Sequence, residues 1–127
     1  MNYTARLKNI CRSLYDNNSD VISVIENFFD SDYEQCINGT TMQRTQYINH
    51  VIAQRQNMII DTFDYKHVIE KEDELFAIYY PMGKNLAGQA VKAEVIAYFK
   101  FKNDKIFRIH GQVRLIDGEL SDVDMKD

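Results

Sequence analysis

The chain has 127 residues, is 45% hydrophobic and 27% charged, and carries a formal net charge of −4, as one ordinary globular domain would. This acidic balance argues against nucleic-acid binding, because such binding needs clustered basic side chains that neutralise phosphates. No apolar run approaches the ~18 residues that span a bilayer. We therefore expect neither a nucleic-acid partner nor a membrane partner.

The cysteines and histidines argue against an oxidising compartment and against metal chemistry. Cys11 and Cys36 are too few for a disulfide framework, and the amino-terminal segment lacks the apolar stretch of a secretory signal. His50, His67 and His110 are isolated in the sequence, without the spacing of metal ligands. No glycine-rich phosphate loop or nucleophile elbow is present. We expect a cytoplasmic protein with no metal and no cofactor.

The first part of the chain predicts two amphipathic helices. Over residues 4–15, apolar side chains recur at the helical spacing i, i+3, i+4 and i+7. A second helix follows, with an apolar face that begins at Val21 and continues to Phe28 and Phe29. Either Ser19 or Asp20 can cap it by accepting backbone N–H bonds.

A short strand and a third helix come next. Residues 32–37 alternate as a strand does and stop at an Asn-Gly pair, which is typical of a tight turn. The four residues 40–43 match a capping box, so we expect a third helix to begin there and to end near Asn57. Its buried stripe would contain Ile48, Val51 and Ile52.

The second half predicts an antiparallel sheet. Odd positions over residues 59–69 are mostly apolar, which predicts one alternating strand. Residues 75–80 are continuously apolar or aromatic, as in a strand covered on both faces. We expect Pro81 and Gly83 to end that strand, and residues 106–116 to form the last one.

Residues 87–102 are consistent with either a helix or a strand. Their many Ala, Lys, Gln and Glu residues favour a helix. Their alternation favours a strand, with one face carrying Val91, Ala93, Val95, Ala97 and Phe99. We favour the strand, because pattern outweighs propensity within a sheet.

Two stretches carry a family resemblance. The segment IENFFDSDYEQCINGTT, with its phenylalanines, acids, short strand and turn, and the segment VIAYFKFKNDKIFRIHGQV, an aromatic-rich hairpin, resemble the nuclear transport factor 2-like superfamily. Within it the chain looks most like the SnoaL-like polyketide cyclases and the ketosteroid isomerases. The resemblance implies an α+β, cystatin-like cone in the order α-α-β-α-β-β-β-β. It also implies one SnoaL-like domain over residues 1–117. The acids at the end of the chain predict a flexible, acidic tail over residues 118–127.

This fold implies a pocket between the concave face of the sheet and the helices, and a homodimer formed through the outer face of the sheet. The residues that we expect to line the pocket come from both halves of the chain. They are Tyr15, Cys36, Tyr47, Val51, Phe63, Val95, Ala97, Phe99, Ile109, Gly111 and Val113.

The acid and base groups of the resembled enzymes are missing at the matching positions. Ketosteroid isomerases need a carboxylate base on the short strand, an acid on the penultimate strand and a tyrosine on the first helix. The resemblance places Cys36, Ala97 and Arg12 there, with Tyr15 displaced from the third position by most of a turn. Gly111 stands where the cyclases carry an aspartate.

We therefore expect a pocket that binds a small apolar molecule without the usual acid and base. Two alternatives remain open: an isomerase, cyclase or dehydratase that uses other groups, and a dimeric protein-interaction module. The candidate groups for catalysis are Cys36, Tyr79, Tyr80 and His110. The alternation favours His110 on the outer face of the last strand. If the opposite set of residues on this strand faced inward, the pocket would contain a basic, polar stripe.

Overall fold

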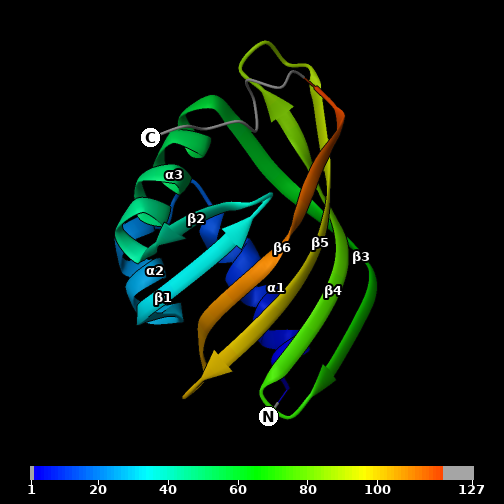
Figure 1. The fold of residues 1–127 in the computed structure, drawn as a ribbon. Coiled ribbons are helices and arrows are strands. Elements are labelled where there is room, and N and C mark those ends of the chain that lie inside the picture. Colours follow the sequence, from blue (N-terminus) through cyan, green and yellow to red (C-terminus); the bar gives the residue numbers. More distant parts are fainter. Residues whose placement is uncertain (1, 119–127) are drawn as a thin grey trace.

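The structure is a computed structural model that describes residues 2–118 (Figure 1). The elements of this part follow in the order α1 (Tyr3–Leu14), α2 (Val21–Phe28), β1 (Phe29–Ile37), β2 (Thr40–Gln43), α3 (Arg44–Asn57), β3 (Met58–Lys71), β4 (Glu74–Asn85), β5 (Ala90–Lys102) and β6 (Lys105–Asp117). The predicted α+β class and the order of its main elements are confirmed. The predicted acidic tail lies, except for Gly118, outside the described residues.

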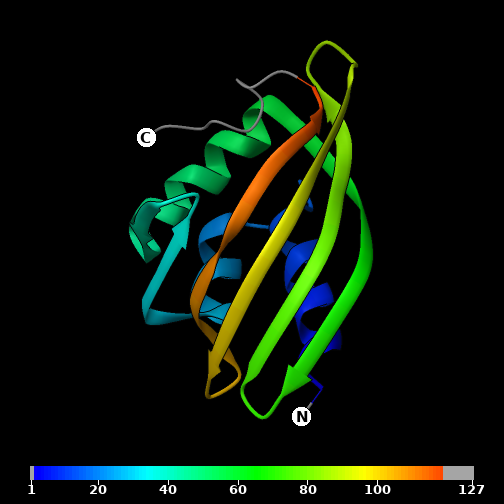
Figure 2. The same cartoon turned by 45° about the vertical axis from the view of Figure 1, so that its right-hand side comes forward.

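The strands form one curved sheet with the order β2-β1-β6-β5-β4-β3. β1 pairs in parallel with β6, and the other neighbours are antiparallel. Figures 1 and 2 show the helices gathered on the side toward which the long strands curve. No helix within residues 2–118 is long and apolar enough to cross a membrane.

The core lies between α1 and the concave face of the sheet. On α1 the predicted apolar stripe is buried, with Leu7 and Ile10 each 1% exposed. It packs in one cluster with inward residues of β4 and β5 such as Leu75 and Phe99. Asp20, one of the two predicted caps, accepts from the backbone N–H of Ser23 at the start of α2.

β5 confirms the strand prediction for the contested segment. Its residues alternate without exception between buried and half-buried from Val91 to Phe101. It pairs with β4 on one side and with β6 on the other, so nearly its whole length lies inside the sheet. Two-sided pairing satisfies the backbone groups that a helix would satisfy internally, which is why the alternation outweighs the helix propensity here.

The capping box predicted over residues 40–43 is wrong. Asn38 and Gly39 adopt positive φ angles of 53° and 79° and make a hairpin turn. Residues 40–43 then pair with β1 as the strand β2, so α3 starts only at Arg44. The helix start is instead capped three residues further along, where Gln46 Oε1 accepts from the Gln43 N–H at 2.8 Å.

The prediction of one uninterrupted alternation along β3 is also wrong. Register shifts between Ile60 and Thr62, and between Tyr65 and His67, each change the face to which the following residues point. As a result Ile59 and Ile69 are 53% and 70% exposed, whereas their neighbours Met58, Ile60 and Val68 turn inward. The positions of such bulges cannot be predicted from the hydrophobic periodicity of the strand alone.

β4 differs from its prediction in two ways. It does not end at Pro81 but continues to Asn85, with Pro81 opposite Phe63 and Gly83 opposite Ile60. The pairing with β5 is interrupted around Pro81, which has no N–H, and resumes at Met82. The strand is also covered on one face only, because Phe76 on the outer face is 42% exposed.

Glu70 caps α1 from across the fold. Its carboxylate accepts from the Tyr3 and Thr4 backbone N–H groups, both at 3.1 Å, and from the Thr4 hydroxyl at 2.7 Å. The first turn of α1 contains no acid of its own, so Glu70 supplies the negative charge that a helix N-terminus favours.

We expect the stability of the protein to fall in acid partly through Glu70. Its bonds, first that from the Thr4 hydroxyl, lower the pKa of Glu70 below 4.5. The stabilisation is thus complete above the ordinary carboxyl pKa and is lost as pH falls through the lower folded value. Urea unfolding should show Glu70→Gln less stable by about 1 kcal/mol near neutral pH, with the difference vanishing in acid. An equal loss at both pH values, or the same loss in the exposed Glu72→Gln control, would contradict this.

Candidate functional site

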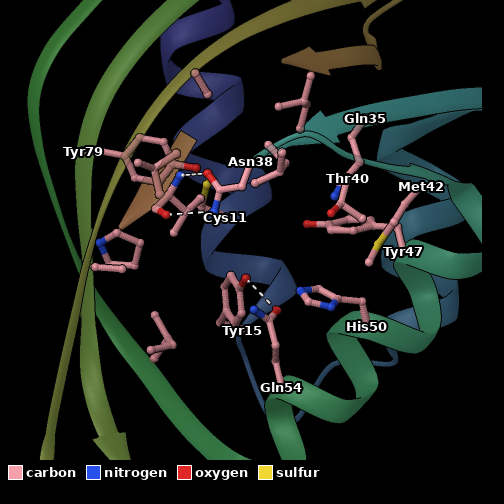
Figure 3. Close-up of a pocket in the computed structure, with 18 of the residues that line it drawn as sticks. Cys11, Tyr15, Gln35, Asn38, Thr40, Met42, Tyr47, His50, Gln54 and Tyr79 are labelled. Carbon is pink, nitrogen blue, oxygen red and sulfur yellow. Dashed lines mark hydrogen bonds between the residues drawn. The ribbon is translucent and has the colours of Figure 1, made fainter. Parts of the chain in front are cut away.

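A cavity of about 890 Å³ lies between the concave face of the sheet and the helices (Figure 3). Two unlike sides enclose it. The sheet wall consists of the lining residues of β3 to β6. The opposite side, called here the helix wall, includes Tyr15, Tyr47, His50 and Gln54 from the helical layer and Gln35 from β1.

The sheet wall is mostly apolar, because alternation turns the hydrophobic face of each strand inward. β5 contributes Ala93, Val95 and Ala97 from its middle, and β6 contributes Ile109 and Val113. Among the described lining residues, Arg114 is the one that carries a fixed charge, and its side chain is 67% exposed and donates to Glu94 at 2.8 Å. Within residues 2–118, no lining residue is an aspartate or a glutamate.

The helix wall is built mainly on one face of α3. Tyr47, His50 and Gln54 follow at i, i+3 and i+7, so they form a row about 10 Å long. Figure 3 shows all three side chains projecting into the cavity from this helix. At one end of the row, the Tyr15 hydroxyl donates to Gln54 Oε1 at 3.0 Å.

Arg55 fixes the end of α1 against α3. Its guanidinium donates to the backbone carbonyls of Leu14, Ser19 and Ser13 at 2.7, 2.6 and 3.1 Å. It also donates to the Ser19 hydroxyl at 2.6 Å. These charge-assisted bonds occupy carbonyl groups at and beyond the end of the helix, and thereby hold Tyr15 where it can reach Gln54.

The residues of β1 that face the cavity are Gln35 and Ile37, and not Cys36 as predicted. Cys36 lies between them on the strand, so alternation turns its side chain to the opposite face. Gln35 is only 7% exposed, and its Oε1 accepts from the Tyr33 hydroxyl at 2.7 Å. The pocket-facing position of this strand is therefore an amide and not a thiol.

The other predicted site residues divide between the cavity, the core and the outer face. Those that line the cavity are Tyr15, Tyr47, Phe63, Tyr79, Val95, Ala97, Phe99, Ile109 and Val113. Val51 does not line it, because it is fully buried in the core. Tyr80 and His110 belong to the outer face, where the Tyr80 hydroxyl donates to Glu94 at 2.6 Å and His110 is exposed.

Gly111 is buried beside Ala97 in the neighbouring strand and lies outside the set of lining residues. A Cβ atom at this position would lie 2.4 Å from the Ile96 carbonyl oxygen and 2.8 Å from Ala97 Cα. The two strands approach so closely that no side chain fits between them. An aspartate of the kind that cyclases carry therefore has no room at Gly111.

Burial keeps the thiol and three of the phenols that line the cavity in their protonated forms. Burial raises the pKa of the Cys11 thiol to about 11, which leaves little reactive thiolate at neutral pH. Burial also raises the pKa values of Tyr15, Tyr47 and Tyr79, so these phenols stay protonated and act as hydrogen-bond donors.

Sequence reasoning missed several lining residues, among them Cys11, Gln35, His50 and Gln54. The spacing of Tyr47, His50 and Gln54 could have revealed one polar helix face, but His50 was judged as a metal ligand rather than by its place on the helix. Within residues 2–118, no group of three or more His, Cys, Asp or Glu residues could hold a metal ion.

No family model and no curated protein sequence matches the chain. Solved structures match it along most of its length. A candidate isomerase from Rhodopseudomonas palustris is 12% identical, with a TM-score of 0.71 over 89% of this chain and 90% of that chain. An NTF2-like protein of unknown function from an Exiguobacterium species is 15% identical, with a TM-score of 0.64 over 84% and 96%. A de novo designed protein with a curved β-sheet is 15% identical, with a TM-score of 0.63 over 87% and 84%.

The chain thus has the nuclear transport factor 2-like fold, as its sequence resemblance predicts. At these identities the likeness establishes the fold alone. Because a designed protein has a similar fold, the function has to be argued from the cavity and not from the fold.

Proposed function

We propose that this protein binds a small, largely apolar molecule in its cavity and does not catalyse a reaction there. The observation that carries the proposal is the cavity itself: its volume is about 890 Å³, it has an apolar wall with a few hydrogen-bonding groups opposite, and none of its lining residues in the described part of the chain is a carboxylate. Sites for small molecules are typically built this way, with an apolar surface for affinity and a few polar groups for orientation.

Titration with the neutral fluorescent probe N-phenyl-1-naphthylamine tests this proposal. We expect saturable binding at one site per chain, with a dissociation constant on the order of micromolar, because a molecule of that size buries most of its surface in such a cavity. Linear, non-saturable fluorescence at all protein concentrations would contradict the proposal.

The chemistry of the lining groups supports binding over isomerisation or cyclisation. Of the four candidate groups predicted from the sequence, only Tyr79 lines the cavity, and burial raises its pKa. The short strand presents the amide of Gln35 to the cavity, and an amide neither takes up nor releases a proton at neutral pH.

The proposal also includes a homodimer formed through the outer face of the sheet. Ile69 pairs with Phe76 there, and Phe76 pairs in turn with Tyr98. Ile69 and Phe76 are 70% and 42% exposed, so they form an uncovered apolar patch across β3 and β4, which Tyr98 extends onto β5. Patches of this kind mark association sites.

Both cysteines are free thiols, which supports a reducing, cytoplasmic location.

Native mass spectrometry and light scattering should show a dimer for the wild-type protein and a monomer for Phe76→Asp. The variant places a charge in the centre of the apolar patch, where pairing would bury it without a partner. Leu86→Asp, in the 79% exposed tip between β4 and β5, is the matched control and should remain dimeric. A monomeric wild-type protein at concentrations of tens of micromolar would refute the dimer.

A further inference from the structure

Among residues 2–118, Gln35 is the polar residue that is buried in the core, with 7% of its surface exposed. The Tyr33 hydroxyl donates to its Oε1 at 2.7 Å. Tyr33 is itself 1% exposed, and burial raises its pKa, so this hydroxyl remains a donor. The bond fixes the orientation of the amide, with the oxygen held by Tyr33 and the NH₂ group at the other end.

The NH₂ group of Gln35 has no acceptor among residues 2–118, and Figure 3 shows the side chain extending from β1 into the cavity. Among residues 2–118, the Tyr65 hydroxyl is the fully buried side-chain atom without a partner, so the Gln35 NH₂ group contacts the open space of the cavity. A ligand that supplies an acceptor at this point gains a direct hydrogen bond, worth about 0.5–1.5 kcal/mol net.

The remaining lining amides present the same polarity. Gln54 Oε1 accepts from the Tyr15 hydroxyl, and Gln46 Oε1 accepts from the Gln43 N–H. Asn38 Oδ1 accepts from the Val113 N–H. Among the described lining residues, each of the four amide oxygens is thus occupied by a protein donor, and none of these residues is a carboxylate. The Asn38 NH₂ group is occupied too, since it donates to the Val113 carbonyl, so the amide donors that face a ligand are those of the three glutamines.

We propose that Gln35 Nε2 anchors an oxygen acceptor of the ligand, a carbonyl or a carboxylate, and that the cavity rejects ligands with an amine at that position. This inference rests on the proposed function, since it specifies the polar end of the molecule that the cavity binds. The sheet wall would hold the apolar body of such a ligand, opposite Gln35.

Four probes with one naphthalene body test it by calorimetry: 2-acetylnaphthalene, 2-naphthoate, 2-ethylnaphthalene and 2-(aminomethyl)naphthalene. We expect the ketone to bind about tenfold more tightly than its ethyl isostere, and the amine to bind most weakly. If the naphthoate exceeds the ketone, the preferred acceptor is a carboxylate; if the ketone exceeds the naphthoate, it is a neutral carbonyl.

Gln35→Met should abolish the preference for the ketone while leaving the affinity for 2-ethylnaphthalene unchanged. Gln35→Glu keeps an acceptor for the Tyr33 hydroxyl and should reverse the order in favour of the amine at alkaline pH, which provides a test even if Gln35→Met does not fold. Gln112→Glu, exposed on the outer face, should change nothing. Equal affinities for ketone and ethyl isostere would overturn the inference and leave cavity binding intact, whereas binding of no probe would overturn the proposed function itself.

Discussion

Replacing both Ala93 and Ala97 by phenylalanine is expected to weaken the binding of N-phenyl-1-naphthylamine by at least about 100-fold, that is, by roughly 2.7 kcal/mol or more. Both residues line the cavity from the same face of β5. Each lies two residues from Val95, which occupies the centre of this face. Two added rings would therefore occupy the middle of the sheet wall, where the apolar body of a ligand is expected to lie. Fluorescence titration measures the loss directly.

The control for this variant uses the opposite face of the same strand. Ile96 lies between the two alanines in sequence but belongs to the outer face, opposite Ile78 of β4. Ile96→Phe should thus bind the probe as tightly as the wild-type protein, and circular dichroism should show both proteins folded. Undiminished binding to a folded double variant would mean that the probe lies elsewhere.

Gly83→Ala is expected to lower the free energy of unfolding by about 3 kcal/mol or more. A Cβ atom at Gly83 would lie 1.7 Å from the carbonyl oxygen of Ile59 and 2.9 Å from Ile60 Cα, in the neighbouring strand. These are backbone atoms, so they cannot turn aside as a side chain would. β3 and β4 would have to separate next to the bulge that turns Ile60 inward.

Urea unfolding measures this loss, and Lys84→Ala is the control. Lys84 is the next residue on β4 and is exposed, so its truncation should change the free energy of unfolding by less than about 0.5 kcal/mol. A loss below about 1 kcal/mol in Gly83→Ala would show that the two strands separate easily at this point.

The sequence predicted the elements well where one periodicity runs without interruption. β5 shows this best, since strict alternation from Val91 to Phe101 outweighed a composition that favours a helix. α1 shows it for the helical period, with Leu7, Ile10 and Leu14 buried as expected. In both elements one face packs on the core, so the period of the pattern and the period of the structure agree.

The sequence failed where a local irregularity changes the face of a strand. Two bulges in β3 turned Ile59 and Ile69 outward, although the uninterrupted pattern grouped them with Phe63. The match to the resembled enzymes placed Cys36 in the cavity, whereas the structure puts Gln35 there, one residue away on β1. Register depends on pairing with distant strands, and the sequence of one segment does not contain that information.

The polar side of the candidate site was the least predictable part. The hydroxyl groups of Tyr33 and Tyr15 donate to Gln35 and Gln54 and so fix the orientation of each amide. Gln54 and Tyr15 are distant in sequence and meet only because Arg55 holds the end of α1 against α3. The polarity of the cavity is therefore a property of the folded arrangement and not of any motif.

The most direct test of the central proposal, that the cavity binds small apolar molecules, is an NMR measurement of where such a molecule lies. Protein labelled at its isoleucine and valine methyl groups would be studied with bound N-phenyl-1-naphthylamine. We predict intermolecular Overhauser effects to Val95, Ile109 and Val113, which line the cavity. Effects confined to Ile69 and Ile78 on the outer face would contradict the proposal.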